Sequence, residues 1–419
     1  MRINWGTTRR RRRRRTTRCV ETLEDRRLMT YGAVRFVPSS STPFELATNS
    51  PVLADFNGDG LLDMAMAAGN SQVGVALGYG NGKFGPARYF DTAASSAAAS
   101  GSTTTVIVGD FNNDGKPDLA YARSGSSLPG YPSDFGVLLN TGAGSGSLSF
   151  EAAATTPARG LSYSLAVGDF NGDGKLDVAA GFRYGSRPGG VFLGNGDGTF
   201  QNGLDLPSAD LATIETVAAA DFNGDGVVDL AVTFANRRQS LESTIGILLG
   251  EGDGTFGTPS LFLAGSAPRA LTMGDFNGDG VLDIATANAG SSPTDDFLKS
   301  VGVLIGDGRG GFTRRSVLPL SSIPIAVTAA DLNGSGKLDL SVLDSDGRLT
   351  VLYGKGNGDF VRFGPRQSLF SAGAGASGNI AVGRIANRTL PDLAVLNGSG
   401  RVTVLLNHSR FSRPLHRRR

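Results

Sequence analysis

Cysteine and histidine are almost absent from this 419-residue chain. Its one cysteine is Cys19, and its two histidines, His408 and His416, both lie close to the C-terminal end. One cysteine excludes an intramolecular disulfide and a cysteine zinc cluster. With no histidine in the body of the chain, a histidine-based catalytic triad or a multi-histidine metal site is excluded there too. No apolar run approaches the ~18 residues that a membrane helix needs, so no transmembrane segment is expected.

Glutamate is also scarce, and charge is unevenly distributed. The chain has 7 Glu against 31 Asp, which favours short carboxylates placed in turns. The formal net charge of +2 hides a charge of +8 in residues 1–30, +5 in residues 410–419 and −11 in the remainder. A negatively charged body repels phosphate, so no nucleic-acid partner is expected. We interpret residues 1–33 as a disordered basic targeting segment and residues 412–419 as a basic C-terminal tail.

Internal repetition is the strongest pattern in the sequence. The nonapeptide D-F-N-G-D-G-x-x-D begins at five positions, with Asn113 in place of the first glycine in the second copy: Asp55, Asp110, Asp169, Asp221 and Asp275. A sixth copy, D-L-N-G-S-G-K-L-D, begins at Asp331, and a degenerate seventh covers residues 382–395. The complete copies start 52 to 59 residues apart. Seven such units fill residues 34–411 and leave no space for a separate domain.

Each unit contains four short runs of β-forming residues bounded by Gly, Asn and Asp. Apolar runs precede and follow the nonapeptide, a Val/Ile/Leu stretch comes next, and a Gly-rich turn with a phenylalanine such as Phe200 or Phe256 closes the unit. Such runs are typical of strands. Seven repeats of four strands predict an all-β fold, a seven-bladed β-propeller of four-stranded antiparallel blades. Residues 34–50 contain Arg35–Pro38, which resembles Arg362–Pro365 after unit six, so we expect an N-terminal strand to close the ring.

The nonapeptide places oxygen atoms where a hard cation needs them. Side chains at positions 1, 3, 5 and 9 and the carbonyl of position 7 converge in a curled loop, and glycine at position 6 permits the left-handed turn. Three carboxylates without imidazole or thiolate favour calcium over zinc or copper, whereas magnesium prefers tighter octahedral sites. An EF-hand is excluded because position 12 is not Glu and the flanks are β-forming. A plain Asx-rich turn without metal remains the alternative.

These positions define the predicted calcium ligands. Unit by unit they are Asp55, Asn57, Asp59, Leu61, Asp63; Asp110, Asn112, Asp114, Lys116, Asp118; Asp169, Asn171, Asp173, Lys175, Asp177; Asp221, Asn223, Asp225, Val227, Asp229; Asp275, Asn277, Asp279, Val281, Asp283; and Asp331, Asn333, Asp339. Ser335 replaces the position-5 Asp of unit six, which predicts a weaker site. In unit seven Arg384 and Arg388 replace ligands 1 and 5, and a guanidinium is expected to neutralise the surviving Asp392. The sequence therefore predicts five calcium ions, a weaker sixth site and none in unit seven.

The repeated motif and its closing Phe resemble FG-GAP and VCBS repeats, as in the integrin α-subunit propeller and many bacterial secreted proteins. Phe84–Gly85 and Phe256–Gly257 retain the Phe-Gly pair. This resemblance implies a seven-bladed propeller with calcium in the loop between the first two strands of a blade. Residues 20–29 resemble the bacterial LEPR-XLL motif of exported proteins, with Asp25 and Met29 as departures. Together they imply a secreted protein, or one on the surface of a bacterial cell.

The expected function is a non-enzymatic binding or adhesion module for an extracellular protein or carbohydrate. Loops on the face opposite the nonapeptides vary most, and their aromatic and arginine side chains suit recognition. The candidates on that face are Tyr131, Tyr184, Arg237, Arg238 and Phe297. The alternative is an enzyme, a polysaccharide lyase or hydrolase, that uses paired Asp carboxylates.

Overall fold

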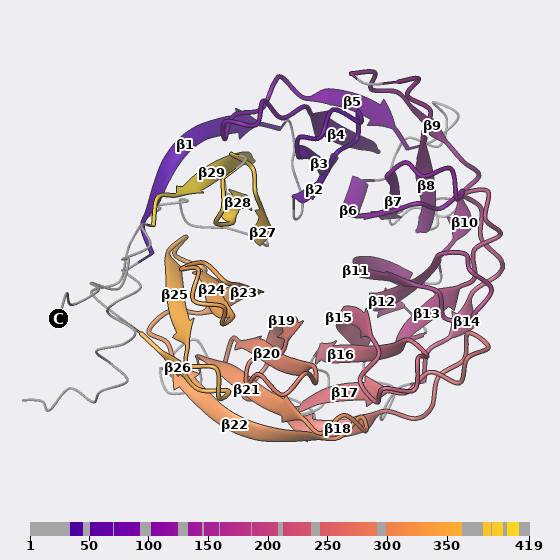
Figure 1. Ribbon diagram of the computed structural model, residues 1–419. Helices are drawn as coiled ribbons and strands as arrows, with labels where there is room; N and C mark the ends of the chain where they lie inside the picture. The colour runs from indigo at the N-terminus through magenta and orange to yellow at the C-terminus, as the bar shows by residue number, and fades with distance from the viewer. Residues whose placement is uncertain are drawn as a thin grey trace, which may run out of the picture.

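Seven sheets surround a common axis in the computed structural model (Figure 1). The structure describes residues 34–44, 51–69, 71–92, 102–124, 133–144, 146–158, 160–185, 187–207, 213–235, 244–290, 299–362, 380–386, 388–396 and 400–409. Within these ranges the regular elements are all strands, and no helix has the length and apolarity needed to cross a membrane. The prediction of an all-β, seven-bladed propeller is therefore confirmed.

Each blade is an antiparallel sheet whose strands follow one another from the ring centre to the rim. Blades one to three contain β2 (Val52–Ala54), β3 (Asp63–Ala68), β4 (Gln72–Ala76) and β5 (Arg88–Asp91); β6 (Ser102–Gly109), β7 (Asp118–Ser124), β8 (Asp134–Asn140), β9 (Phe150–Ala152) and β10 (Thr156–Pro157); β11 (Gly160–Gly168), β12 (Asp177–Gly185), β13 (Gly189–Phe192) and β14 (Leu204–Asp205). Blades four to seven contain β15 (Thr213–Ala220), β16 (Asp229–Ala235), β17 (Thr244–Leu248) and β18 (Ser260–Leu263); β19 (Pro268–Gly274), β20 (Asp283–Asn288), β21 (Ser300–Gly306) and β22 (Phe312–Pro319); β23 (Pro324–Ala330), β24 (Asp339–Asp344), β25 (Leu349–Gly354) and β26 (Phe360–Val361); β27 (Ile380–Gly383), β28 (Asp392–Leu396), β29 (Arg401–Asn407) and β1 (Phe36–Pro43). In blade two the outer strand is split, and β9 and β10 both pair with β8.

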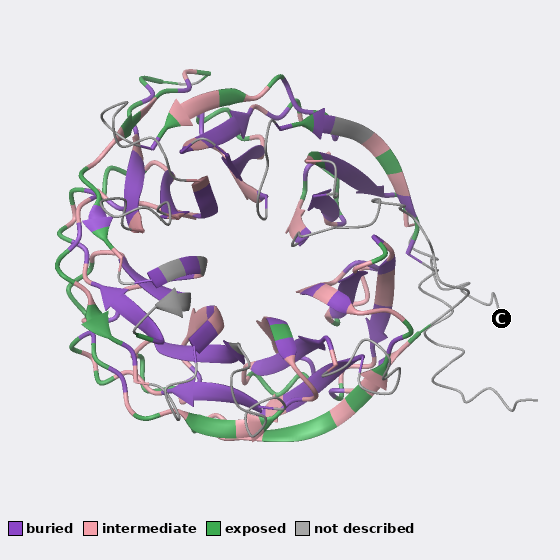
Figure 2. Ribbon diagram, turned by 180° about the vertical axis from the view of Figure 1, so that it is seen from behind, coloured by how far each residue is buried: buried purple, intermediate pink, exposed green. Residues whose placement is uncertain are grey.

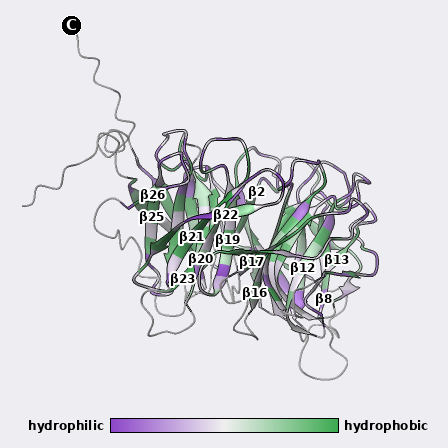
Figure 3. Cartoon of the chain, turned by 90° about the horizontal axis from the view of Figure 1, so that it is seen from below, coloured by the Kyte–Doolittle hydropathy of each residue, from purple (hydrophilic) through white to green (hydrophobic). Residues whose placement is uncertain are grey.

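The second strand of a blade is covered on both faces by the neighbouring blades. All residues of β3, β20, β24 and β28 are buried, which explains why β3 and β28 are continuous apolar runs after their first Asp and why β20 and β24 are mainly apolar. The outer strand β22 is mainly exposed and contains Arg314 and Arg315, and charged residues on an edge strand discourage pairing with other chains. Figure 2 shows this change from buried inner strands to an exposed rim, and Figure 3 shows the apolar residues concentrated in the strands.

Phenylalanine pairs connect consecutive blades. The motif residue at position 2 of one blade packs edge-to-face against the closing Phe of the next blade, with ring centroids 5.4 to 5.9 Å apart. The pairs are Phe56–Phe150, Phe111–Phe200, Phe170–Phe256, Phe222–Phe312 and Phe276–Phe360. Aromatic pairs in this geometry contribute about 0.5–1.5 kcal/mol each beyond their buried area. In these five pairs the closing Phe of one unit therefore packs against the preceding blade as well as closing its own unit.

The N-terminal strand closes the ring, as predicted. Strand β1 pairs antiparallel with β29, from Phe36 opposite Asn407 to Pro43 opposite Arg401, and completes blade seven (Figure 1). The backbone N–H of Val34 also donates to the Tyr353 hydroxyl of blade six at 2.7 Å. Both chain ends of the ring are thus held in one sheet; residues 45–50 of the predicted closing segment lie outside the described residues.

The internal alignment that suggested this strand is three residues out of register. Phe36 lies opposite Asn407 as Phe360 lies opposite Gly354, so its counterpart in blade six is Phe360 and not Phe363. Phe36 is 2% exposed and shares a core cluster with Leu332, the position-2 residue of blade six. It therefore supplies the closing aromatic that blade seven lacks in its own sequence. The short Arg-Phe-x-Pro match gave the wrong register because cross-strand packing, and not the flanking residues, fixes the pairing.

Candidate metal centres

The six complete nonapeptides form the loops between the first and second strands of blades one to six. In blade three the Asp169 carboxylate accepts N–H groups of Asp173 at 3.1 Å and of Gly174 at 2.8 Å. The Asn171 side-chain oxygen accepts the same Asp173 N–H at 3.1 Å. One amide therefore orients the oxygens of positions 1 and 3 toward the same point. The carboxylate at position 5 turns back to the N–H of position 7, Lys175, at 3.0 Å.

The same arrangement recurs around the ring. The position-1 carboxylate accepts the position-6 N–H at 2.7 to 2.9 Å in every complete copy. Blade six keeps this loop although Ser335 stands at position 5, because its N–H still binds Asp331 and Asn333 at 2.9 Å. The loop conformation therefore does not need the third carboxylate, which makes that carboxylate available for another role.

Two loop positions have left-handed backbone conformation, and only the one at position 6 was predicted from the sequence. Gly174 at position 6 has φ +80°, as expected, and Gly172 at position 4 has φ +71°. Asn113 at position 4 of blade two has φ +57°. Asparagine is one of the few residues that tolerate this region. In the sequence, the replacement of Gly by Asn at position 4 of blade two could have indicated this second left-handed residue, because these two residue types share that conformation.

The position-9 aspartate is a structural tie as well as a predicted ligand. In all seven blades it is fully buried, and each of its two carboxylate oxygens accepts a backbone N–H. One donor lies in the loop and the other lies at the end of the third strand, opposite the closing Phe. For Asp63 they are Phe56 at 2.9 Å and Gly78 at 2.8 Å. The spacing of the nonapeptide does not indicate this second role, which fastens the loop to the third strand.

Blade seven corrects one expectation. Asp392 accepts the N–H groups of Ala386 and Asn407, both at 2.8 Å, and is not neutralised by a guanidinium. Arg388 instead lies 3.2 Å from the ring nitrogens of His408. Among the described residues, no ion pair joins Asp392 to Arg384 or Arg388. Backbone amides can hold a buried carboxylate without a positive side chain, which explains why this aspartate persists where the other ligands are lost.

Burial changes the pKa of the position-9 carboxyls. It raises the pKa of Asp63 and Asp118 to about 6 and that of Asp339 to about 7, and the neighbouring loop carboxylates contribute in the same direction. The pKa values of Asp177, Asp229 and Asp283 are raised for the same reasons. Six crowded, desolvated carboxylates therefore favour a proton or another positive charge over the bare anion.

These shifts predict the pH dependence of the metal-free protein. A carboxyl whose pKa is higher in the folded state stabilises the fold below its unfolded pKa, and this stabilisation is lost as pH rises through the folded value. Asp197, Asp253, Asp307 and Asp359 have lowered pKa values, so their contribution to stability is constant above pH ~3.8 and is lost only as pH falls below it. We expect the free energy of unfolding, measured by urea titration after metal removal, to fall between pH 5 and 7.5. Constant stability over that window would contradict the assignment.

The loops fit calcium by the chemistry of their donors. Positions 1, 3, 5 and 9 offer carboxylate and amide oxygens, and positions 1 and 3 already face one point. Among the described residues, however, no group of three or more Asp, Glu, His or Cys side chains is arranged to hold a metal ion as the loops stand. Calcium would be held by positions 1, 3, 5 and 9 and the position-7 carbonyl, and would supply positive charge to carboxylates that otherwise repel one another.

The loops are not equivalent in charge. The Lys116 ammonium lies 3.5 Å from the position-5 carboxylate Asp114, and Lys175 lies 3.6 Å from Asp173. Position 7 is Leu61, Val227 or Val281 in blades one, four and five. An ammonium partly neutralises a carboxylate, although an exposed pair is worth only about 0–1 kcal/mol. The electrostatic potential at the loops of blades two and three is therefore slightly less negative, and less favourable to a cation, than at the loops of blades one, four and five.

The candidates on the opposite face are only partly covered by the structure. Tyr184 lies in β12 with its backbone opposite Leu161, and its side chain lies outside the described residues. Tyr131, Arg237, Arg238 and Phe297 also lie outside them. The antiparallel order places the loops between second and third strands at the end of each blade opposite the nonapeptides.

Comparison with known proteins agrees with this architecture. Among solved structures, the chain is similar to the crystal structure of BBS1N in complex with ARL6DN soaked with mercury, with 11% identity and a TM-score of 0.57 over 90% of this chain and 99% of that one. The same complex soaked with lead gives 12% identity and a TM-score of 0.55 over 88% and 96%. At this identity the similarity shows the fold.

The family comparison covers more than half of the chain. Residues 35–121, 127–180, 181–232 and 234–286 match the FG-GAP-like repeat family, and residues 162–199 also match the FG-GAP repeat. These segments contain the nonapeptide loops of blades one to five and the closing Phe residues of blades one to four. The chain belongs to the FG-GAP-like repeat family.

Proposed function

We propose that this protein is a calcium-stabilised binding or adhesion module without catalytic activity, secreted from a bacterium or displayed on its surface. The observation that carries the proposal is the sixfold recurrence of an all-oxygen loop around a closed ring, with a fully buried carboxylate beneath each loop. Five loops keep three carboxylates, so we propose five calcium ions, with a weaker site in blade six. Extracellular calcium modules bind with Kd values of ~10⁻⁴ to 10⁻³ M, and such sites fill only outside the cytosol.

The ligand-binding face proposed here is the one opposite the nonapeptides. Its loops carry Tyr131, Tyr184, Arg237, Arg238 and Phe297. Aromatic and arginine side chains contribute strongly to recognition of proteins and carbohydrates. A propeller of similar shape occurs in complex with another protein in the BBS1N structures, which supports use of this fold as a binding scaffold. The LEPR-XLL-like residues 20–29 support export.

A glycan array, run with calcium and with EDTA beside a polysaccharide-degradation screen, tests this proposal. We expect binding without turnover. Simultaneous change of Tyr131, Tyr184 and Arg238 to alanine should abolish binding to any glycan that scores, whereas Lys83→Ala on the nonapeptide face should leave it intact. Turnover of a polysaccharide would favour the lyase or hydrolase alternative, and full binding by the triple variant would exclude that face.

A further inference from the structure

Five of the six complete nonapeptide loops have glycine directly after the asparagine at position 3. The pairs are Asn57–Gly58, Asn171–Gly172, Asn223–Gly224, Asn277–Gly278 and Asn333–Gly334, whereas blade two has Asn112–Asn113. An asparagine side chain can react with the backbone nitrogen of the next residue. Glycine hinders this reaction least, because it has no Cβ and the widest backbone freedom. These loops therefore place a reactive neighbour beside a predicted calcium ligand.

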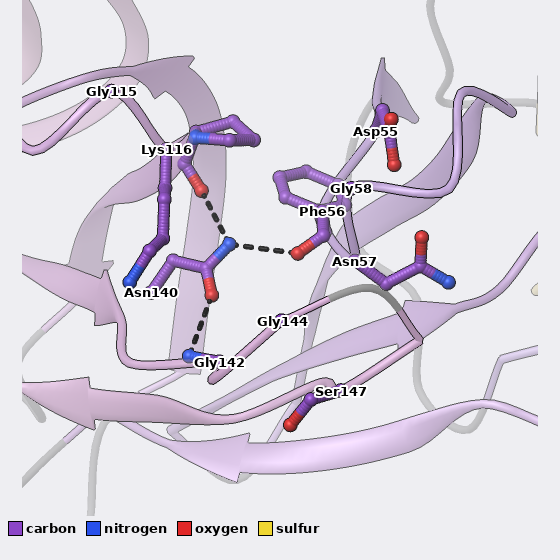
Figure 4. Close-up of a pocket in the computed structure, with 11 residues that line it drawn as sticks. Asp55, Phe56, Asn57, Gly58, Gly115, Lys116, Asn140, Gly142, Gly144 and Ser147 are labelled. Carbon is purple, nitrogen blue, oxygen red and sulfur yellow. Dashed lines mark hydrogen bonds between the residues drawn. The ribbon is translucent and has the colours of Figure 1, made fainter.

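Water can reach these pairs. In blade one Asn57 and Gly58 line a pocket of about 320 Å³ between blades one and two (Figure 4). At Gly58 and Gly172 no heavy atom lies within 4 Å of the point where a Cβ would stand, and both glycines are exposed. Hydrolysis needs water at the site and a way out for the leaving group. Access therefore does not limit a reaction of these asparagines.

The loop of blade three holds its asparagine with the fewest hydrogen bonds. In blades one, four and five the position-3 side-chain nitrogen donates to the position-5 carboxylate at 2.7 to 3.0 Å. In blade three that carboxylate, Asp173, lies 3.6 Å from the Lys175 ammonium instead. In the part of the chain that the structure describes, neither the Asn171 side-chain nitrogen nor the Gly172 N–H donates a hydrogen bond. Rotation of the Asn171 amide therefore breaks only the bond that its oxygen accepts from Asp173 at 3.1 Å.

A bound cation would restrain the same side chain. In the proposed function the position-3 oxygen is a calcium ligand, together with oxygens of positions 1, 5, 7 and 9. Without a cation the three carboxylates of a loop repel one another, and a loop opens locally at a lower free energy than the whole ring unfolds. We therefore expect chelation to release the asparagine while the blades stay folded. This calcium dependence rests on the proposed function, whereas the reactivity of the Asn-Gly pairs does not.

We propose that the position-3 asparagines of these five loops are sites of spontaneous deamidation, and that calcium protects them. The glycine backbone nitrogen attacks the asparagine Cγ, a C–N bond forms, the Cγ–Nδ2 bond breaks, and ammonia leaves with the proton of the backbone N–H. Water then opens the resulting succinimide at one of its two carbonyls and gives aspartate or isoaspartate. Each event adds one negative charge to the body of the chain, whose formal charge is already −11. Isoaspartate also lengthens the main chain between positions 3 and 4 by one carbon.

Two reciprocal substitutions test the site without disturbing the fold. Gly172→Asn gives blade three the Asn-Asn pair of blade two, and the position accepts it because Asn113 has φ +57° where Gly172 has φ +71°. Asn113→Gly gives blade two the Asn-Gly pair. The internal control is Asn195–Gly196, the same pair in the Gly-rich turn of blade three, where the Asn195 side-chain nitrogen donates to Thr199 at 2.9 Å. This turn lies outside the calcium loops, so its deamidation reports unfolding of the ring.

Each protein is incubated in mildly alkaline buffer with calcium or with EDTA, below both melting transitions, then digested at acidic pH and analysed by peptide mass spectrometry. In EDTA we expect Asn171 to deamidate about tenfold faster than Asn112. Gly172→Asn should protect Asn171, and Asn113→Gly should make Asn112 as labile as wild-type Asn171. Calcium should slow the reaction of Asn171 several-fold and leave that of Asn195 unchanged.

Three results would overturn the proposal. They are an Asn171 as stable in EDTA as Asn112, an Asn171 rate unaffected by calcium although elemental analysis finds the ion bound, and equal acceleration of Asn195 in EDTA, which would indicate unfolding of the ring. Absence of bound calcium, with Asn171 equally labile in both buffers, would instead overturn the proposed calcium function and confirm the asparagines as reactive sites.

Discussion

Chelation with EDTA should lower the melting temperature of this protein by about 9 °C relative to millimolar calcium. With a Kd of ~0.1 mM, each filled site stabilises the folded state by about 1.4 kcal/mol, and five independent sites give about 7 kcal/mol. The entropy of unfolding for a ring of this length is roughly 0.8 kcal/mol per kelvin, which converts that free energy into the stated shift. The buried position-9 carboxyls provide the physical reason, because desolvation and neighbouring carboxylates make their ionised forms unfavourable without a cation.

Differential scanning calorimetry and elemental analysis of the same samples check this result. A variant with Asp173→Asn and Asp225→Asn removes one carboxylate from each of two loops and should lose about two-fifths of the calcium-dependent shift. Asp197→Asn is the control, since that carboxylate lies in a Gly-rich turn and caps Thr199. Identical melting with calcium and with EDTA, together with fewer than three calcium ions per chain, would leave the Asx-turn interpretation in place.

Loss of the closing strand should destabilise the ring by a comparable amount. Deletion of residues 34–47 removes all of β1 and exposes the edge of β29, an unpaired template for other chains. It also removes Val34, Phe36 and Phe44, whose side chains are at most 3% exposed. We expect a melting temperature more than 5 °C lower and partial self-association, measured by calorimetry and sedimentation.

A single substitution separates ring closure from general loss of folding. Phe36→Ala should cost about 3–5 kcal/mol, because it removes a buried aromatic side chain and leaves a cavity against Leu332. Leu204→Ala is the control on an exposed outer strand, where the side chain is 37% exposed. If the deletion variant and Phe36→Ala both had the melting temperature of the wild-type protein, closure by β1 would contribute nothing to stability.

The sequence determined the blade number and the loop chemistry because the same strand pattern and the same nonapeptide recur along the chain. Seven units, each with four β-forming runs, allow few other architectures, and Asp, Asn and Gly at fixed spacing allow few other loops. Residues such as Asp169, Asn171 and Gly174 act within nine positions of one another, so their geometry follows from local spacing.

Only the tertiary structure decided how neighbouring units meet. The pairing of Phe56 with Phe150 and the register of Phe36 in blade seven join different units of the chain, and the tie between Asp63 and Gly78 joins two strands of one blade; none of these contacts is encoded in the nonapeptide itself. Likewise, the nonapeptide does not indicate that the Gly146 N–H of the longer turn in blade two donates to the Asn57 carbonyl of blade one. Contacts across blades depend on packing of side chains from distant parts of the chain, which a repeat motif read in one dimension does not specify.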